Sequence, residues 1–212
     1  MDARGTGTAS AEAGAGRAGR RKARTRAALL EAGRGLLAER GAADTTIAEI
    51  TARANLGFGT FYLYFQSKEE LLGTVVSEGM TGLLRELDRA TAGLDDLAER
   101  QRAAIRAYLR FAHDNGDLFQ IMLRAAPSWA DLVQRYQQPF LERTEAFLRE
   151  GMAAGEVSAG SVELRANMIL ACVRWMGMWW VDHEEPTPDE VADELIGFIE
   201  SGIGQPETPA TT

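Results

Sequence analysis

Residues 45–72 read TTIAEITARANLGFGTFYLYFQSKEELL, and the pattern of these residues is the most informative in the chain. Threonines, which are favourable N-cap residues, precede two isoleucines at helical spacing. Asn55 follows that pattern and tolerates the left-handed conformation that a tight turn requires. The spacing therefore predicts a helix over 46–53, a turn over 54–57 and a second short helix over 57–65.

This helix–turn–helix arrangement suits the reading of DNA, because a short second helix can present its N-terminal end to a major groove about 12 Å wide. Glycines on both sides of Phe58 let the backbone approach closely. Tyr62 and Tyr64 offer hydroxyls to phosphates, while we expect Phe61 and Phe65 to face inward. The alternative is a compact helical hairpin in which all four of these aromatic side chains are core.

Bulk composition indicates an ordinary globular protein. Of the 212 residues, 45% are hydrophobic and 25% are charged. The single cysteine, Cys172, excludes an intramolecular disulfide framework and fits a reducing cytoplasm. No apolar run is long enough for a transmembrane helix, and no apolar run follows the basic N-terminal residues as in a secretory signal. We therefore expect a cytoplasmic protein without membrane association.

The charge is unevenly distributed. The net charge of −8 argues by itself against a nucleic-acid partner. Residues 1–68, however, hold 11 Lys or Arg and 6 Asp or Glu, whereas residues 69–212 are strongly acidic. Within the basic part, residues 17–26 (RAGRRKARTR) carry six basic residues and no acid. This asymmetry indicates a basic module fused to an acidic one, although a solubilising tail would look similar.

The remaining sequence predicts an all-α protein, since no strand-like alternation is present. Beyond residue 66, Gly, Asn-Gly and Pro breaks separate helices expected at 68–91, 95–113, 117–125, 128–153, 160–183 and 188–202. The predicted organisation is a disordered tail (1–19), a three-helix DNA-binding domain (20–66), a helical ligand-binding and dimerisation domain (67–204) and a second disordered tail (205–212).

The stretch at 45–72, with LLEAGRGLLAERGAADTTI before it, resembles the signature of the TetR family of transcriptional regulators, down to FYLYF and the following Ser-Lys-Glu-Glu-Leu. The resemblance covers about residues 22–72 and implies a helix-turn-helix regulator. Asn55 stands where the family usually has the turn glycine. Gly57 and Phe58 replace a more usual polar pair, which removes potential donors to base edges and shifts specificity toward Thr60, Leu63 and apolar contact with thymine methyl groups.

The resemblance also implies which residues face DNA. We expect DNA contacts from five places in the chain. Threonines at the start of the second helix, two tyrosines and a lysine that opens the fourth helix should contact phosphates. Residues at the start of the third helix should lie in the major groove, and a basic N-terminal arm should follow the backbone or enter a minor groove. These residues are Thr45, Thr46, Phe58, Gly59, Thr60, Tyr62, Tyr64, Lys68 and, in the arm, Arg20, Arg21, Lys22, Arg24 and Arg26.

The helix expected at 160–183 is apolar around much of its circumference. Leu164, Met168, Cys172, Trp175 and Trp179 share one face, and Ile169, Val173, Met176 and Trp180 share another. Such a helix must be buried on two sides, either as the central helix of a monomer or against a partner. The resemblance implies that it pairs, together with the helix at 188–202, with its copies in a homodimer.

A small-molecule effector is the other implied partner. We expect large apolar walls with a few polar groups, formed by Phe119, Met122, Trp129, Tyr136, Phe140, Trp175 and Trp179. Arg174 interrupts the apolar helix, so a desolvated guanidinium there needs either an internal carboxylate or an anionic ligand. Tryptophan and methionine favour a hydrophobic or aromatic effector, and nothing identifies it or the operator.

No arrangement of residues indicates catalysis, a metal or a cofactor. The two histidines, His113 and His183, lie beside acids near helix ends, and Cys172, central in the apolar helix, is expected to be a small core residue rather than a nucleophile. The expected function is a homodimeric, ligand-responsive transcriptional regulator that binds a palindromic DNA operator, with repression as the family's usual mode. The alternative is a helical protein-interaction module whose basic arm binds acidic partners.

Overall fold

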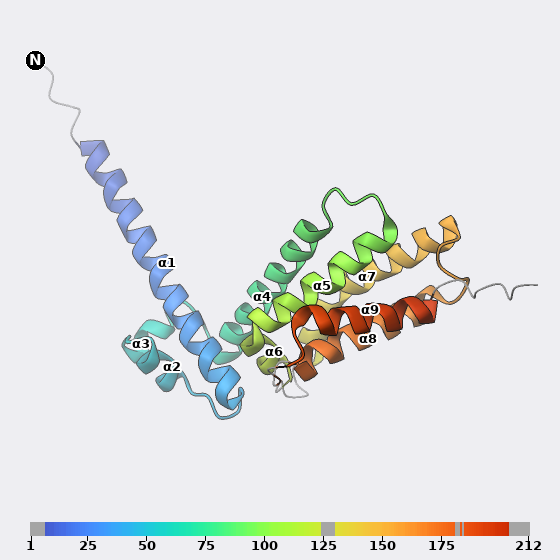
Figure 1. The fold of residues 1–212 in the computed structure, drawn as a ribbon. Helices are drawn as coiled ribbons and strands as arrows, with labels where there is room; N and C mark the ends of the chain where they lie inside the picture. The colour runs from blue at the N-terminus through green and yellow to red at the C-terminus, as the bar shows by residue number, and fades with distance from the viewer. Residues whose placement is uncertain (1–6, 124–129, 181–182, 184, 204–212) are drawn as a thin grey trace, which may run out of the picture. The chain divides into compact units, whose positions relative to one another are not determined.

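The computed structural model describes residues 7–123, 130–180, 183 and 185–203, and the side chains among them except those of residues 7–17, 123 and 130–134. Every regular element in the described part is a helix, which confirms the all-α prediction (Figure 1). The chain forms two compact units, residues 1–75 and 76–212. The division falls inside a continuous helix, whereas the sequence predicts a boundary between residues 66 and 67.

The first unit contains α1 (Gly7–Arg40), α2 (Ile47–Arg53), α3 (Phe58–Phe61) and the start of α4 (Lys68–Thr91). Its core combines leucines of α1 and α4 with apolar residues of the two short helices and of the turn after α3, namely Leu29, Leu30, Leu36, Leu37, Ile50, Phe61, Phe65, Leu71 and Leu72. The structure continues α1 through residues 7–19, where the sequence composition predicts disorder.

Local signals in the sequence place the ends of these helices. Thr46 and Glu49 form a capping box at the start of α2, in which the Glu49 N–H donates to the Thr46 hydroxyl at 3.3 Å and the Thr46 N–H donates to the Glu49 carboxylate at 3.0 Å. Asn55 has φ +55°, so the predicted left-handed turn is confirmed. At α4, the Glu70 N–H donates to the Ser67 hydroxyl at 3.2 Å.

The second short helix is shorter than the predicted span of 57–65. After Phe61 the backbone tightens, because the N–H of Leu63 donates to Thr60 and that of Tyr64 donates to Phe61, three residues back. This tightening accompanies burial of both Phe61 and Phe65, which are 0% and 2% exposed.

The second unit contains the rest of α4 with α5 (Leu97–Asp114), α6 (Gly116–Leu123), α7 (Ala130–Ala154), α8 (Val162–Trp180) and α9 (Pro188–Ile203). Helix α5 packs on both α8 and α9, and α7 packs on α8 (Figure 1). The core between these helices is aliphatic around one large side chain, Trp180, whose indole N–H donates to the Pro186 carbonyl at 2.7 Å. No helix within the described residues is long and apolar enough to cross a membrane.

Three ion pairs join α5 to α9 in antiparallel register. Arginines spaced four residues apart on α5 meet acids spaced along α9 at N–O distances of 2.6 to 2.7 Å, in the pairs Arg102–Glu200, Arg106–Asp193 and Arg110–Asp189. These side chains are substantially exposed, so each pair contributes little stability. Their spacing nevertheless favours one register of α9 on α5.

Candidate functional site

The exposed surface of α3 and the turn behind it carries large apolar side chains. Phe58 is 55% exposed, Tyr62 52% and Leu63 75%, whereas Phe61 is buried completely. The Tyr62 ring contacts Phe58 and Phe61 edge-on, at centroid distances of 5.7 and 5.5 Å. The sequence prediction that Phe61 and Phe65 face inward is therefore confirmed, and the alternative in which all four aromatics are core is wrong.

Other predicted DNA-facing residues surround this surface. Gly59 is exposed, and a Cβ there would meet nothing within 4 Å. Thr60 and Tyr64 are half-buried, and Thr46 is exposed while it caps α2. These residues therefore lie on the two short helices and in the turns beside them, next to the exposed surface of α3.

The basic segment is part of α1. Arg20, Arg21, Lys22 and Arg24 are exposed along it, and Arg26 is half-buried with its guanidinium 5.6 Å from the centroid of the Phe65 ring. Arg26 is therefore tied to the core of the first unit by a cation–π contact.

Thr45 corrects one prediction. It is 0% exposed, and its hydroxyl lies 2.8 Å from the Gly41 carbonyl and 3.3 Å from the Leu36 carbonyl, to which it donates. The side chain stabilises the connection between α1 and α2 and is not available to a phosphate. No local sequence pattern indicates these hydrogen bonds, because the two acceptor carbonyls belong to the preceding helix and its end.

Lys68 also has partners that no local pattern revealed. Its ammonium donates to the carbonyl of Ala42 and, at 2.7 Å, to the carbonyl of Thr45, which holds the α1–α2 connection against the start of α4. Two of its three N–H groups are used in this way. Arg40 and Arg53 are paired similarly with acids, Glu49 at 2.9 Å and Glu39 at 2.5 Å.

The pKa values of two acids reflect this packing of α1 on α2. Hydrogen bonds from the Thr46 hydroxyl and backbone lower the pKa of Glu49, and Arg40 contributes further. The hydrogen bond from Arg53 lowers the pKa of Glu39. Both acids are therefore charged at neutral pH and hold the guanidinium groups of this unit.

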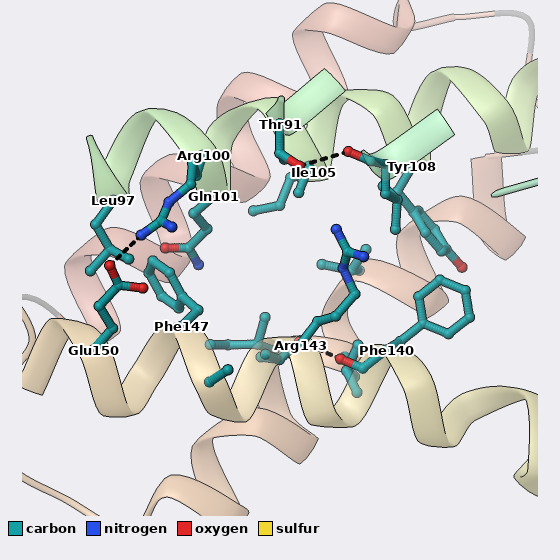
Figure 2. Close-up of a pocket in the computed structure, with 17 residues that line it drawn as sticks. Thr91, Leu97, Arg100, Gln101, Ile105, Tyr108, Phe140, Arg143, Phe147 and Glu150 are labelled. Carbon is teal, nitrogen blue, oxygen red and sulfur yellow. Dashed lines mark hydrogen bonds and ion pairs between the residues drawn. The ribbon is translucent and has the colours of Figure 1, made fainter. Parts of the chain in front are cut away.

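The second unit contains two partly open cavities between α4, α5, α7 and α8. The larger cavity has a volume of about 340 Å³ and is mostly apolar, with a few polar groups. Figure 2 shows Tyr108 and Phe140 at one end, Leu97, Arg100, Phe147 and Glu150 at the other, and Arg143 between them. Of the residues predicted to line a ligand pocket, only Phe140 belongs to it. The sequence does contain one indication of this cavity, because Leu97, Gln101, Ala104 and Tyr108 are spaced so that they share one face of a helix.

The smaller cavity, of about 280 Å³, contains most of the predicted ligand residues. It is also bordered by α6, and it brings together Phe119, Met122, Tyr136, Phe140 and Arg174. Trp129 lies outside the described residues. Arg174 is exposed at the border of this cavity, so the sequence expectation of a desolvated guanidinium is wrong.

Trp175 and Trp179 do not belong to this cavity, which corrects their assignment. They lie on another face of α8, where they are 64% and 41% exposed and border an open groove with Phe198 of α9. Leu164 and Met168 of α8 are also more than half exposed. Ile169, Val173 and Trp180 are buried instead, as expected for a helix with two apolar faces. Among the described residues, no cluster of His, Cys, Asp or Glu could hold a metal ion.

Comparison with known proteins covers both units. A model described as "Bacterial regulatory proteins, tetR family" matches residues 29–75, and a model described as "Tetracyclin repressor-like, C-terminal domain" matches residues 94–203. The second match alone extends over about half of the chain, and the two together include the helix–turn–helix and most of the cavity-lining helices.

Individual relatives agree with these matches. The chain is 24% identical to the fatty acid metabolism regulator protein of Bacillus subtilis over 82% of this chain and 93% of the relative. It is also 24% identical to the transcriptional repressor KstR2 of Rhodococcus jostii, over 87% and 94% respectively. The crystal structure of FadR from Bacillus subtilis in complex with stearoyl-CoA has the same fold, with a TM-score of 0.75 at 20% identity over 83% of this chain and 98% of that one.

Proposed function

Because the chain belongs to the TetR family of bacterial regulatory proteins, we propose that it represses transcription by binding a palindromic DNA operator as a homodimer, and that a small hydrophobic effector releases it. As a member of this family it is a ligand-responsive transcriptional regulator rather than an enzyme. The observation that carries the proposal is the exposed surface of α3 in a helix–turn–helix whose core is fully formed.

On DNA, α3 enters the major groove with Phe58, Gly59 and Thr60 nearest the bases. Tyr62 and Tyr64 donate their hydroxyls to phosphates on either side. The exposed side chains of Phe58 and Leu63 favour apolar contact with thymine methyl groups rather than bidentate hydrogen bonds. The operator half-site therefore contains an A·T pair under α3.

The basic side chains on α1 supply the electrostatic part of binding. Arg20, Arg21, Lys22 and Arg24 are exposed on one segment without an acid, and phosphates are their complementary partner. This contribution does not depend on base sequence and weakens as salt rises.

The homodimer forms through the outer faces of α8 and α9. Soluble monomers rarely expose several large apolar side chains together, and here Leu164, Met168, Trp175 and Phe198 are all at least 60% exposed. Two copies of these helices bury that surface in a four-helix contact. The two recognition helices of such a dimer must lie about 34–36 Å apart on a two-fold-related site.

The effector binds in the cavities of the second unit. Their apolar linings support a hydrophobic molecule, and so do two similar proteins, one solved with stearoyl-CoA and one described as a ketosteroid regulator. To release the protein from DNA, the effector must bind the conformation that does not fit the operator more tightly than the DNA-binding conformation, by several kcal/mol.

Selection of bound duplexes from a random pool tests the DNA part of the proposal, with Tyr62→Ala as the control. Enrichment of a two-fold palindrome by the wild type alone is the expected result. If nothing is enriched at low salt, where phosphate contacts are strongest, the chain is instead an interaction module whose basic segment binds acidic partners.

Sedimentation of the wild type and of Trp175→Glu tests the dimer. We expect a dimer at micromolar concentration for the wild type and a monomer for the variant, because a charge on the contact face cannot be paired by its symmetric copy. A monomeric wild type would leave the outer face of α8 without a function.

A further inference from the structure

The cationic side chains at the two cavities differ in their partners. In the larger cavity Arg100 is 2.6 Å from Glu150, and Arg143 is 2.5 Å from Asp88. Both guanidinium groups are therefore neutralised within the protein. Arg174, at the smaller cavity, makes no ion pair with any acid whose side chain the structure describes, and none of the described residues lining that cavity is acidic.

The two cavities are neighbours along the bundle. Tyr108, Phe140, Leu170 and Val173 line both of them. The larger cavity extends from this shared wall toward Leu97 (Figure 2). The smaller one extends toward Phe119 and Met122 of α6. A ligand pocket usually has a volume of about 300–1,000 Å³, so neither cavity alone holds more than a small molecule. Occupied together, they suit an elongated one.

From this arrangement we propose that the two cavities bind the two ends of one amphipathic anion, an aliphatic chain in the larger cavity and a negatively charged head at Arg174. The inference rests on the proposed function, since it specifies the effector of the same regulator. The larger cavity offers no unpaired cation to the head, and the smaller one offers no acid that would repel it. The charge pattern thus determines the direction in which the ligand lies.

Tyr108 is the positioning residue at the shared wall. Its ring contacts Phe119 edge-on at 5.8 Å, and Gly177 allows α8 to approach, because a Cβ there would be 2.9 Å from Cε1 of Tyr108. Burial raises the pKa of the Tyr108 hydroxyl, and the nearby charge of Arg174 partly opposes that rise. The hydroxyl therefore stays protonated and remains a hydrogen-bond donor beside the charged head.

Calorimetric titration of the purified full chain, without DNA, tests the inference. Dodecanoate and dodecanol are the probes, since they share a chain and differ in charge. Arg174 is exposed, so water replaces part of the lost charge-assisted hydrogen bond, and Arg174→Gln should weaken dodecanoate binding about tenfold. Dodecanol binding should change less than twofold. Arg110→Gln, which removes an exposed guanidinium outside both cavities, is the control and should leave both affinities unchanged.

Equal weakening of both probes by Arg174→Gln, or none, would overturn the assignment of the head. The tail is tested by chain length, because each buried methylene contributes about 0.8 kcal/mol, or about fourfold in affinity. Affinity that stops rising between hexanoate and dodecanoate would exclude an aliphatic chain in the larger cavity.

Two sources of the anion share this chemistry, a free carboxylate and the phosphates of an acyl thioester such as dodecanoyl-CoA. Whichever of the two loses affinity in Arg174→Gln identifies the head that the guanidinium binds. If no probe binds while the duplex selection still yields a palindrome, this inference fails and the proposed function stands. If the probes bind as expected and no duplex is enriched, the DNA-binding proposal fails instead.

Discussion

Replacing Lys68 by methionine tests whether its ammonium stabilises the first unit or contacts DNA. The ammonium donates to the carbonyls of Ala42 and Thr45, which lie in the connection between α1 and α2. Methionine keeps most of the aliphatic stem and removes all three donors. The sequence predicts a phosphate contact for Lys68, whereas these two hydrogen bonds predict a role in stability.

The expected loss follows from three contributions. Two hydrogen bonds from a charged donor contribute about 3–6 kcal/mol when both groups are buried. Lys68 is only half-buried, so water replaces part of this contribution in the variant. Its charge also lies at the N-terminus of α4, where removing a cation is favourable by about 0.3–1 kcal/mol. We therefore expect Lys68→Met to lower the free energy of unfolding by about 2 kcal/mol.

Urea unfolding followed by circular dichroism measures this change, and the salt dependence of operator binding separates the two roles. Lys22 is the matched control, because it is the only other lysine and is exposed on α1. Lys22→Met should leave stability within about 0.5 kcal/mol and reduce the salt slope by about 0.9, the value for one phosphate contact. Our reasoning is refuted if Lys68→Met unfolds like the wild type and shows that reduced slope instead.

Three further changes have defined outcomes. Hydrogen bonding lowers the pKa of Glu49 below 4.5, so its stabilising effect is present above that pH and is lost as pH falls through the lowered value. Glu49→Gln should thus lower the urea midpoint at pH 7, and its difference from the wild type should shrink as the pH falls through that lowered pKa. Asn55 has φ +55°, so Asn55→Ala should cost about 1 kcal/mol by thermal unfolding, and Asn55→Gly should not. Gly177→Ala should cost about 1–3 kcal/mol through overlap with Tyr108, whereas Gly73→Ala, whose Cβ meets nothing within 4 Å, should stabilise the protein; a stabilised Gly177→Ala would contradict the packing described.

Features that depend on interactions between residues close in sequence were predicted correctly. The threonine cap at the start of α2 and the left-handed Asn55 both depend on neighbours up to three positions away. Periodicity likewise separated Phe61 and Phe65 from the exposed Tyr62, since residues four apart share a face of a helix.

Sequence patterns by themselves therefore determined that the chain is helical, where most helices begin and end, and that a basic helix–turn–helix precedes an acidic helical part. Which side chains lie opposite one another became clear from the packing of the helices and not from any sequence pattern. This packing buried the Thr45 hydroxyl against α1, and it placed Trp175 and Trp179 on one face of α8 and Arg174 beside a cavity on another. A helix presents several apolar faces at once, and periodicity cannot say which neighbour each face meets, because that depends on how helices distant in sequence pack together.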